Sequence, residues 1–262
     1  MRILKTIALG AAMLATTLAP AYAQATNLLD DIIQRGVLNV GVGLGTPPYG
    51  LIDANMQPDG HDVELARMIA RDLGVEINLV DTTAANRVPN LTSGKLDIVI
   101  YSFSVTAERA KAIAFSNTVY VDSQVYVAPS AATAASLEDL VGKNIGVTRA
   151  STNDIAMTNR AVEGTNIQRY DDDASTSQAL LAGQVEGIVT SGALAKAIAE
   201  RNPDLTVQFT VASAPMSIGL PRGQSDLLHW LNTEIFLLDN NGELARLQEK
   251  WMGAAVENLP RF

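Results

Sequence analysis

The segment TVYVDSQVYVAPS, residues 118–130, is an extended run rich in β-branched and aromatic residues, which favour strands. A second extended run, LTVQFTVASAPMSIGLPRG at residues 205–223, precedes the last helical patterns. Two such runs bracket residues 131–216 and predict that the chain crosses twice between two lobes. The central block then forms one lobe, and the two flanking blocks together form the other.

Short apolar strand patterns alternate with helical patterns along the rest of the chain. Helical periodicity is clearest in HDVELARMIARDLG, residues 61–74, and in ASTSQALLAGQ, residues 174–184. Alternation of this kind is typical of an α/β fold whose parallel sheets are covered by helices. The predicted strands are residues 37–43, 75–80, 96–102, 144–148, 166–170 and 186–190.

The division into lobes follows from these two patterns. Residues 27–125 together with 220–262 are expected to form one lobe, and residues 128–217 the other, each a sheet flanked by helices. Ligands of such folds bind at the carboxyl ends of the strands, which here face the cleft between the lobes. The cleft is therefore the predicted functional site.

Residues 1–23 have the layout of a secretory signal peptide. Arg2 and Lys5 give it a basic start, an apolar run follows, and small residues precede the predicted cleavage site at Gln24. The alternative, a permanent membrane anchor, fits less well because the uninterrupted apolar stretch is short and ends at Pro20.

Composition excludes several classes of partner. Cleavage leaves 17 of the 19 basic residues against 28 acidic ones, a net charge of −11 without any basic block, which argues against nucleic acid and anionic membrane surfaces. No later run approaches the roughly 18 apolar residues of a membrane span, so the mature chain is not expected to insert into a membrane. Cysteine is absent, so no disulfide or thiolate site is available and the core must supply the stability.

Two short patterns resemble cofactor or metal motifs without meeting their requirements. GVGLG at residues 41–45 lacks the third glycine of a dinucleotide fingerprint, because Thr46 occupies its place and two prolines follow. DDD at residues 171–173 lacks the alternating spacing of a calcium loop. A solvated turn that caps a helix from Ala174 is the favoured interpretation.

Catalytic machinery is not evident either. His61 and His229 are far apart and neither has metal-binding spacing, so surface or helix roles are expected for both. No nucleophile stands in a recognisable motif with its base. We therefore predict no catalytic residue, no metal ligand and no cofactor.

One stretch does indicate a binding site: SFSVTAERAKAIAFS, residues 102–116. Ser102 and Ser104 end a predicted strand, Thr106 can cap a helix, and Arg109 lies in its first turn, where the helix dipole disfavours a cation by roughly 0.3–1 kcal/mol. An anion there would meet free N–H groups, hydroxyls and a guanidinium that binds carboxylates with two parallel hydrogen bonds. The local sequence leaves open the alternative that Arg109 pairs with a surface carboxylate.

Four long segments add a second line of argument: GHDVELARMIARDLG (60–74), ANRVPNLTSGKLDIVI (85–100), SFSVTAERAKAIAFSNTVY (102–120) and NNGELARLQEKWMG (240–253). In collinear order they resemble the polar amino-acid-binding proteins of bacterial ABC importers. The resemblance implies the two-lobed periplasmic-binding-protein fold, with two crossover segments at the hinge. It also implies that the cleft closes on a bound solute.

The resemblance assigns roles to individual residues. In that family the arginine of the TxERA motif binds the α-carboxylate of the ligand, helped by the hydroxyls just before it; the matching residues are Arg109, Ser102 and Ser104. A turn at a helix N-terminus of the second lobe closes over the same carboxylate. The matching residues are Ser151, Thr152 and Asn153.

The chain departs from the family at the other end of the ligand. Ser191 replaces the aspartate that usually meets the α-ammonium, and Thr46 and Ala84 replace aromatic walls. Tyr101 stands where a small hydroxyl is usual, either as a displaced aromatic shelf or as a core residue, and His61 replaces an aromatic or aliphatic residue. Either neutral groups hold the ammonium, or the ligand has no primary ammonium.

The function implied is that of a periplasmic, monomeric substrate-binding component that delivers a small carboxylated solute, an amino acid or derivative, to an inner-membrane ABC permease. One alternative is an enzyme similar to cyclohexadienyl dehydratases, disfavoured because Ser191 leaves no evident acid. Another is a ligand-sensing ectodomain. It would need a membrane span or signalling domain, for which the sequence up to Phe262 offers no candidate.

Overall fold

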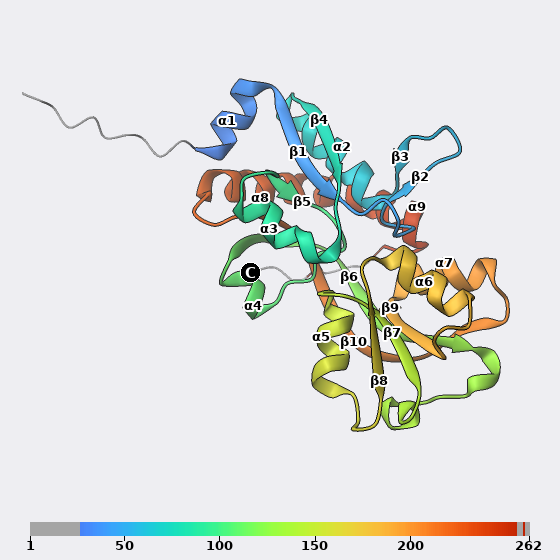
Figure 1. The fold of residues 1–262 in the computed structure, drawn as a ribbon. Coiled ribbons are helices and arrows are strands. Elements are labelled where there is room, and N and C mark those ends of the chain that lie inside the picture. The colour runs from blue at the N-terminus through green and yellow to red at the C-terminus, as the bar shows by residue number, and fades with distance from the viewer. Residues whose placement is uncertain (1–26, 256–258, 260–262) are drawn as a thin grey trace, which may run out of the picture.

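A computed structural model describes residues 27–255 and residue 259. Figure 1 shows two bulky halves, joined by the long strands β6 (Ile113–Pro129) and β10 (Leu205–Pro221). The signal peptide predicted at residues 1–23 lies outside the described residues. The two extended runs that predicted the crossings correspond to these two strands.

Each half combines strands with helices, in the order shown in Figure 1. The upper half holds α1 (Leu28–Arg35), β1 (Val37–Val42), β2 (Leu51–Ile52), β3 (Pro58–Asp59), α2 (His61–Leu73), β4 (Glu76–Asp81), η1 (Ala84–Asn86), α3 (Arg87–Thr92), β5 (Ile98–Val99), α4 (Ala107–Ala110), α8 (Ser225–Asn240) and α9 (Glu243–Met252). The lower half holds η2 (Ser130–Ala132), η3 (Leu137–Leu140), β7 (Asn144–Thr148), α5 (Thr152–Arg160), β8 (Asn166–Tyr170), α6 (Asp173–Leu181), β9 (Gly187–Ser191) and α7 (Gly192–Arg201).

Eight strands form one hydrogen-bonded ladder in the order β4-β1-β5-β10-β6-β9-β7-β8. β1 pairs in parallel with β4 and β5, and β7 pairs in parallel with β8 and β9. β6 and β10 are antiparallel to each other, from Ile113–Pro221 to Pro129–Leu205, and each is also antiparallel to its other neighbour, β9 and β5 respectively. The expected α/β fold, with sheet strands flanked by helices in each half and two crossover segments between the halves, is therefore confirmed, and the two crossover strands join the strands of both halves into one ladder. The residue limits of the lobes stay a prediction.

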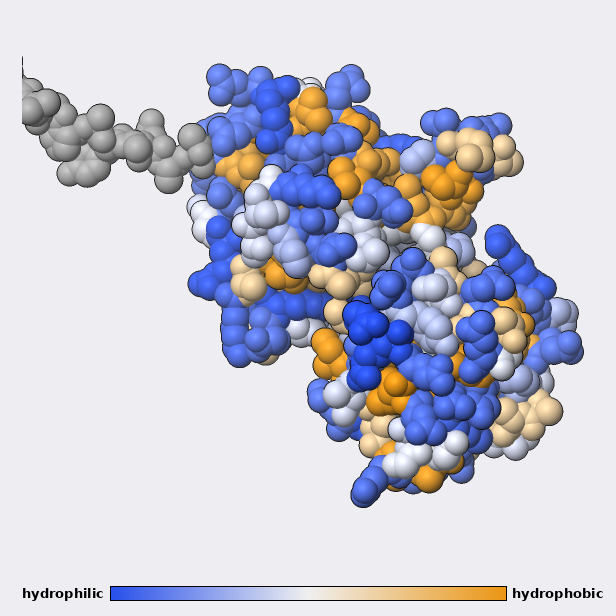
Figure 2. All heavy atoms as spheres, viewed as in Figure 1, coloured by the Kyte–Doolittle hydropathy of each residue, from blue (hydrophilic) through white to orange (hydrophobic). Residues whose placement is uncertain are grey.

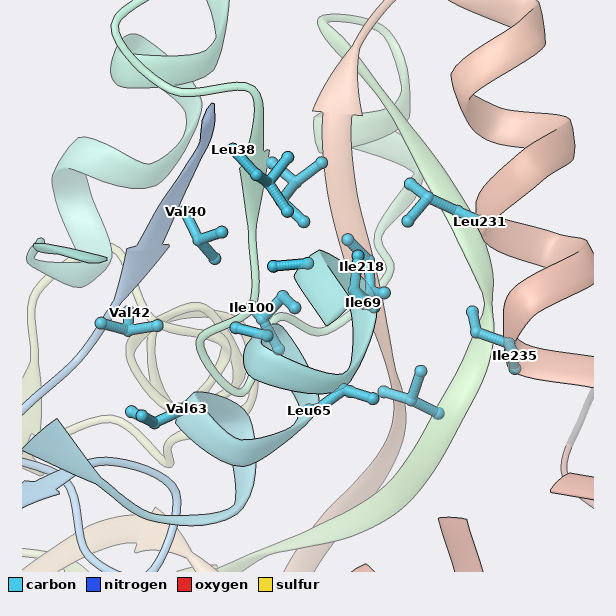
Figure 3. Close-up of a cluster of buried hydrophobic side chains, with 14 of the residues drawn as sticks. Leu38, Val40, Val42, Val63, Leu65, Ile69, Ile100, Ile218, Leu231 and Ile235 are labelled. Carbon is cyan, nitrogen blue, oxygen red and sulfur yellow. The ribbon is translucent and has the colours of Figure 1, made fainter. Parts of the chain in front are cut away.

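The core of the upper half lies between β1, α2, β10 and α8 (Figure 3). Leu38, Val40 and Val42 alternate along β1 and point to one face of the sheet, as the two-residue period of a strand requires. Ile69 of α2 and Ile235 of α8 are fully or almost fully buried against that face. This core joins segments from both ends of the chain.

The core of the lower half covers both faces of its sheet. Val127 of β6 packs with residues of α6 and α7, including Leu180 and Ala195. Its neighbour Tyr126 faces the other side and packs with Met157 of α5. Successive strand residues point to opposite faces, so a strand buried on both faces reads as a continuous apolar run.

Two glycines show why helices end where they do. Gly36 and Gly74 follow α1 and α2 with φ of 70° each, in the left-handed region that glycine adopts without a steric penalty. Their N–H groups donate back to carbonyls of the last helical turn. The chain then turns directly into β1 and β4.

The surface in Figure 2 mixes hydrophilic and hydrophobic side chains over both halves, with a narrower middle between them. In the part of the chain that the structure describes, no helix is both long and apolar enough to cross a membrane.

Candidate functional site

A cavity of about 30 Å³ lies where the two halves face each other. Its walls come from the ends of strands and from the first residues of helices in both halves. The lining residues are Thr46, Ala84, Arg87, Tyr101, Ser102, Asp122, Ser123, Gln124, Ser151, Thr152, Asn153, Asp173, Thr190, Ser191 and Met216.

Most residues predicted for the site line this cavity. From the upper half these are Thr46, Ala84, Tyr101 and Ser102; from the lower half they are Ser151, Thr152, Asn153 and Ser191. Arg109 and Ser104 do not line it and lie beside it instead. Both contact the segment at residues 150–152 of the lower half.

Arg109 is buried at this contact between the halves. Its guanidinium donates to the Ser104 carbonyl (2.7 Å) and to the Ala150 carbonyl (3.1 Å), and lies 4.9 Å from the ring centre of Phe103. Burial, and to a lesser degree the Arg87 guanidinium, lower the pKa of Arg109 to about 8. The alternative of a surface ion pair is wrong.

The helix that carries Arg109 is short. The Thr106 hydroxyl caps it by accepting from the Arg109 N–H (3.2 Å), but α4 is a single turn. A single turn has little macrodipole, because few peptide units align. The charge of the guanidinium, rather than the helix N-terminus, is therefore the main attraction for an anion.

The predicted hydroxyls are held in place by neighbours. Ser104 Oγ lies 2.9 Å from Thr152 Oγ1 across the cleft. Ser102 has a φ of 38°, and its N–H donates to the Asp62 carboxylate (2.8 Å). Asp62 therefore fixes a strained backbone position.

The turn before α5 lies at a helix N-terminus, as the resemblance implied, and Ser151 caps this helix. The Ser151 hydroxyl accepts from the Asp154 N–H (3.1 Å), and Ala150 adopts a φ of 57°. The N–H groups of a first helical turn have no acceptor within the helix. Asn153 Oδ1 is buried and has no hydrogen-bond partner among the described residues.

Arg87 is a site residue that the sequence analysis missed. Its guanidinium lines the cavity, is 3% exposed, and donates to the carbonyls of Ala84 (3.1 Å) and Tyr101 (3.0 Å). Burial lowers its pKa. The sequence offers one signal for it, an arginine directly before VPNL in one of the four segments that resemble the family. Within the described residues, no ion pair includes Arg87 or Arg109.

Asp173 was also missed. Asp172 caps α6, as predicted for this acidic run, but Asp173 turns into the cleft. Its carboxylate accepts from the hydroxyls of Tyr101 (2.8 Å), Thr46 (3.0 Å) and Thr148 (2.6 Å). The interpretation of the whole run as a solvated turn is therefore wrong for this residue.

Asp122 and Gln124 lie on the same face of β6 and complete the lower wall. The Asp122 carboxylate accepts from the Tyr49 hydroxyl and from the Ser123 N–H, yet burial raises its pKa. Gln124 pairs with Ser191 across β6 and β9. Because Asp122 and Asp173 both line the cavity, the argument that Ser191 leaves it without an acid is wrong.

Tyr101 combines its two expected roles in part. The side chain is 3% exposed and packs in a buried cluster with Phe103, so it is a core residue. Tyr101 also lines the cavity, and the Arg87 guanidinium carbon lies over the Tyr101 ring, 5.2 Å from the ring centre. Contact with a ligand stays a prediction.

His61 begins α2 and is fully buried, so its surface interpretation is wrong and its helix interpretation is right. Its Nδ1 lies 2.8 Å from the Asp62 carboxylate, and its ring meets Tyr120 edge-on at 4.8 Å. Tyr120 in turn stacks on Tyr49 at 5.6 Å. Asp62 holds the Ser102 N–H, and Tyr49 donates to Asp122. The contacts of His61 and Tyr120 therefore connect the residues that position Ser102 and Asp122.

Comparisons with known proteins agree with this architecture. Residues 38–254 match the bacterial extracellular solute-binding proteins, family 3. The L-cystine-binding protein TcyJ of Escherichia coli (strain K12) is 32% identical over 234 residues, 87% of this chain and 87% of that protein. These matches cover almost all described residues.

Solved structures give the same result. The P235GK mutant of ArgBP from T. maritima has a TM-score of 0.82 and 34% identity, covering 86% of this chain and 99% of that one. The ancestral amino acid-binding protein AncCDT-1, a precursor of cyclohexadienyl dehydratase, has a TM-score of 0.81 and 28% identity, with 86% and 99% coverage. The chain therefore belongs to family 3 of the bacterial extracellular solute-binding proteins.

Proposed function

We propose that this chain is the substrate-binding component of an ABC importer and captures a small carboxylated solute, an amino acid or derivative, between its two halves. The observation that carries the proposal is Arg109, a buried cation at the contact between the halves that forms no ion pair among the described residues. A buried charge is stable only when it is paired or well hydrogen-bonded. A ligand carboxylate supplies that partner.

The carboxylate would accept two parallel hydrogen bonds from Arg109, which now donates to two carbonyls. Ser102 and Ser104 add hydroxyl donors from the upper half. The first turn of α5, at Thr152 and Asn153, adds N–H groups from the lower half. Since both halves contribute, the ligand binds the closed arrangement better than the open one.

The remaining parts of the proposal concern the chain as a whole. Residues 27–125 with 220–262 form one lobe and residues 128–217 the other, which the separate cores support. Residues 1–23 direct export and are removed, so that the mature protein acts in the periplasm as a monomer. Its protein partner is an inner-membrane permease.

Isothermal titration of the mature protein, from Gln24, tests the function. The panel holds the common L-amino acids, L-cystine, betaine and simple carboxylates. We expect one of the amino acids to bind, and Arg109→Ala to weaken it by about 30-fold or more, because loss of one partner of a buried charge pair costs roughly 2–5 kcal/mol. Arg149→Ala, which removes an exposed arginine nearby, serves as the matched control.

A folded Arg109→Ala protein that binds within a factor of three of the parent would place the anion site elsewhere. Circular dichroism establishes that the variant is folded.

We also propose that the chain is not an enzyme. The relative TcyJ is a binding protein by name. The carboxylates of Asp122 and Asp173 favour the alternative, since either could act as an acid. Incubation of the mature protein with a cyclohexadienyl acid, monitored for the absorbance of an aromatic product, decides between the two; product formation above the buffer rate contradicts the proposal.

A further inference from the structure

We infer that Asp173 binds the ammonium group of the solute, so that the solute is a zwitterion with a primary ammonium rather than a betaine or a simple carboxylate. The inference rests on the proposed function, because it concerns the other end of the same ligand. Asp173, at the start of α6 in the lower half, would then take the role of the aspartate that Ser191 replaces.

Asp173 has acceptor capacity left. An ionised carboxylate offers about four acceptor positions, and three hydroxyls occupy three of them, those of Tyr101, Thr46 and Thr148. All three donors are neutral. Among the described residues no cation lies within ion-pair distance of Asp173, and Arg87 acts on it only at longer range. A ligand ammonium would supply both the charge and the fourth donor.

The same cavity contains two further acceptors without donors. Gln124 Oε1 and Asn153 Oδ1 have no hydrogen-bond partner among the described residues, and their side chains belong to residues that are only 5% and 8% exposed. Buried polar groups are nearly always paired in native proteins. Two unpaired acceptors indicate a ligand rich in N–H donors. A primary ammonium has three, whereas betaine and simple carboxylates have none.

The side chains of Asp122 and Ser191, which also line the cavity, already have partners. Asp122 accepts from the Tyr49 hydroxyl and from the N–H groups of Ser123, Gly192 and Ala193. The Ser191 hydroxyl caps α7 by accepting from the Leu194 N–H (3.3 Å). Asp173 is therefore the carboxylate of the cavity with room for another donor.

The dimensions fit one small cationic group. A water molecule needs roughly 10–15 Å³ of such space, so about 30 Å³ corresponds to two water-sized groups. Asp173, Gln124 and Asn153 border this one small space.

Titration of matched ligand pairs tests the inference. Each pair joins an amino acid to its analogue without the ammonium: L-cystine with 3,3′-dithiodipropionate, L-arginine with 5-guanidinopentanoate, and L-glutamine with 4-carbamoylbutanoate. For the pair whose amino acid binds, Asp173→Asn should weaken the amino acid by about 30-fold or more and leave the analogue nearly unchanged. Asp171→Asn, which changes an exposed carboxylate of the same run, should alter neither.

The variant Tyr101→Phe separates contact from support. It removes one hydroxyl from Asp173 but keeps the carboxylate, so the preference for the amino acid over its analogue should persist.

If Asp173→Asn weakens both members of a pair equally, or neither, Asp173 does not contact the ammonium, while the proposed function stands. If the parent binds an analogue or betaine as tightly as any amino acid, the inference fails without reference to any variant. If the parent binds no member of the panel, the proposed function fails with it.

Discussion

Gly43 determines where Tyr101 can lie. It follows β1 directly, and a Cβ atom at this position would stand 2.1–2.5 Å from the Tyr101 ring. No real side chain tolerates that distance, so the flat ring packs directly on the backbone. The phenol then reaches Asp173 across the cleft.

Gly43→Ala should therefore weaken ligand binding by pushing Tyr101 away from Asp173. Overpacking of this kind costs roughly 1–3 kcal/mol of stability. Gly187→Ala is the matched control, because its Cβ would meet the Tyr126 ring at 2.3 Å in the core of the lower half. Urea unfolding should show a loss in both variants, and calorimetry a loss of affinity in the first alone. Equal affinity of Gly43→Ala and parent would show that Tyr101 does not shape the site.

At the scale of elements, α2, α8 and α9 meet around a buried carboxyl. Burial, first, and then the neighbouring Asp72 raise the pKa of Glu234 to about 7, although Arg71 acts in the opposite sense. Arg71 itself bonds to Asp72 and Glu243. The charged form of Glu234 is therefore less favourable in the folded than in the unfolded chain.

Glu234→Gln should stabilise the protein at pH 8 and not at pH 4. Below about 4.5 the carboxyl is protonated in both states, whereas the folded protein loses stability as the pH rises from there through about 7. The gain at pH 8 should be about 1–3 kcal/mol in urea unfolding. Glu249→Gln, an exposed position on α9, serves as the control. An equal gain at both pH values would remove titration as the cause.

Sequence periodicity predicted the first and last residues of some strands correctly and those of others poorly. NIGVT and NIQRY are β7 and β8, because each is a short segment with β-branched or aromatic residues between turns. LDIVIYS was expected to be a strand throughout, yet β5 is only Ile98–Val99. Its end is set by contacts remote in sequence, such as the Ser102 N–H bond to Asp62. No local pattern contains that information.

The candidate site divides in the same way. The cap Thr106 is a local feature that the sequence alone predicted, whereas Ser151 was placed at a helix start only by the resemblance to the family. Asp173 and Gln124 were missed because the sequence pattern is local. Strand periodicity and helix capping show only on which side of a strand or helix a residue lies. Whether that side faces solvent, core or cleft depends on how the two halves meet.

At the scale of the whole molecule, the two halves touch through side chains that a ligand must pass. Ser104 Oγ and Thr152 Oγ1 are 2.9 Å apart, and the hydroxyls of Thr46 and Tyr101 reach Asp173. Entry of a solute therefore requires these contacts to separate.

A disulfide between Ser104→Cys and Thr152→Cys should hold the cleft shut. The chain has no other cysteine, so the bond can form only there. Oxidised without ligand, the double variant should bind no solute in calorimetry, and reduction should restore the affinity of the two single variants. Binding by the oxidised form that equals the reduced form would mean that solutes enter without separation of the halves.

The continuous ladder also sets the order in which the protein can mature. The core in Figure 3 combines Leu38 near the start of the chain with Ile218, Leu231 and Ile235 near its end, whereas the cores of the lower half use residues 125–211 only. Ribosomes and translocation channels deliver a chain from its N-terminus, so the half that appears first must wait for the last segments. The half delivered second can be completed first with the first part of β10, and the rest of β10, continuing along β6, then leads into the older half as it closes.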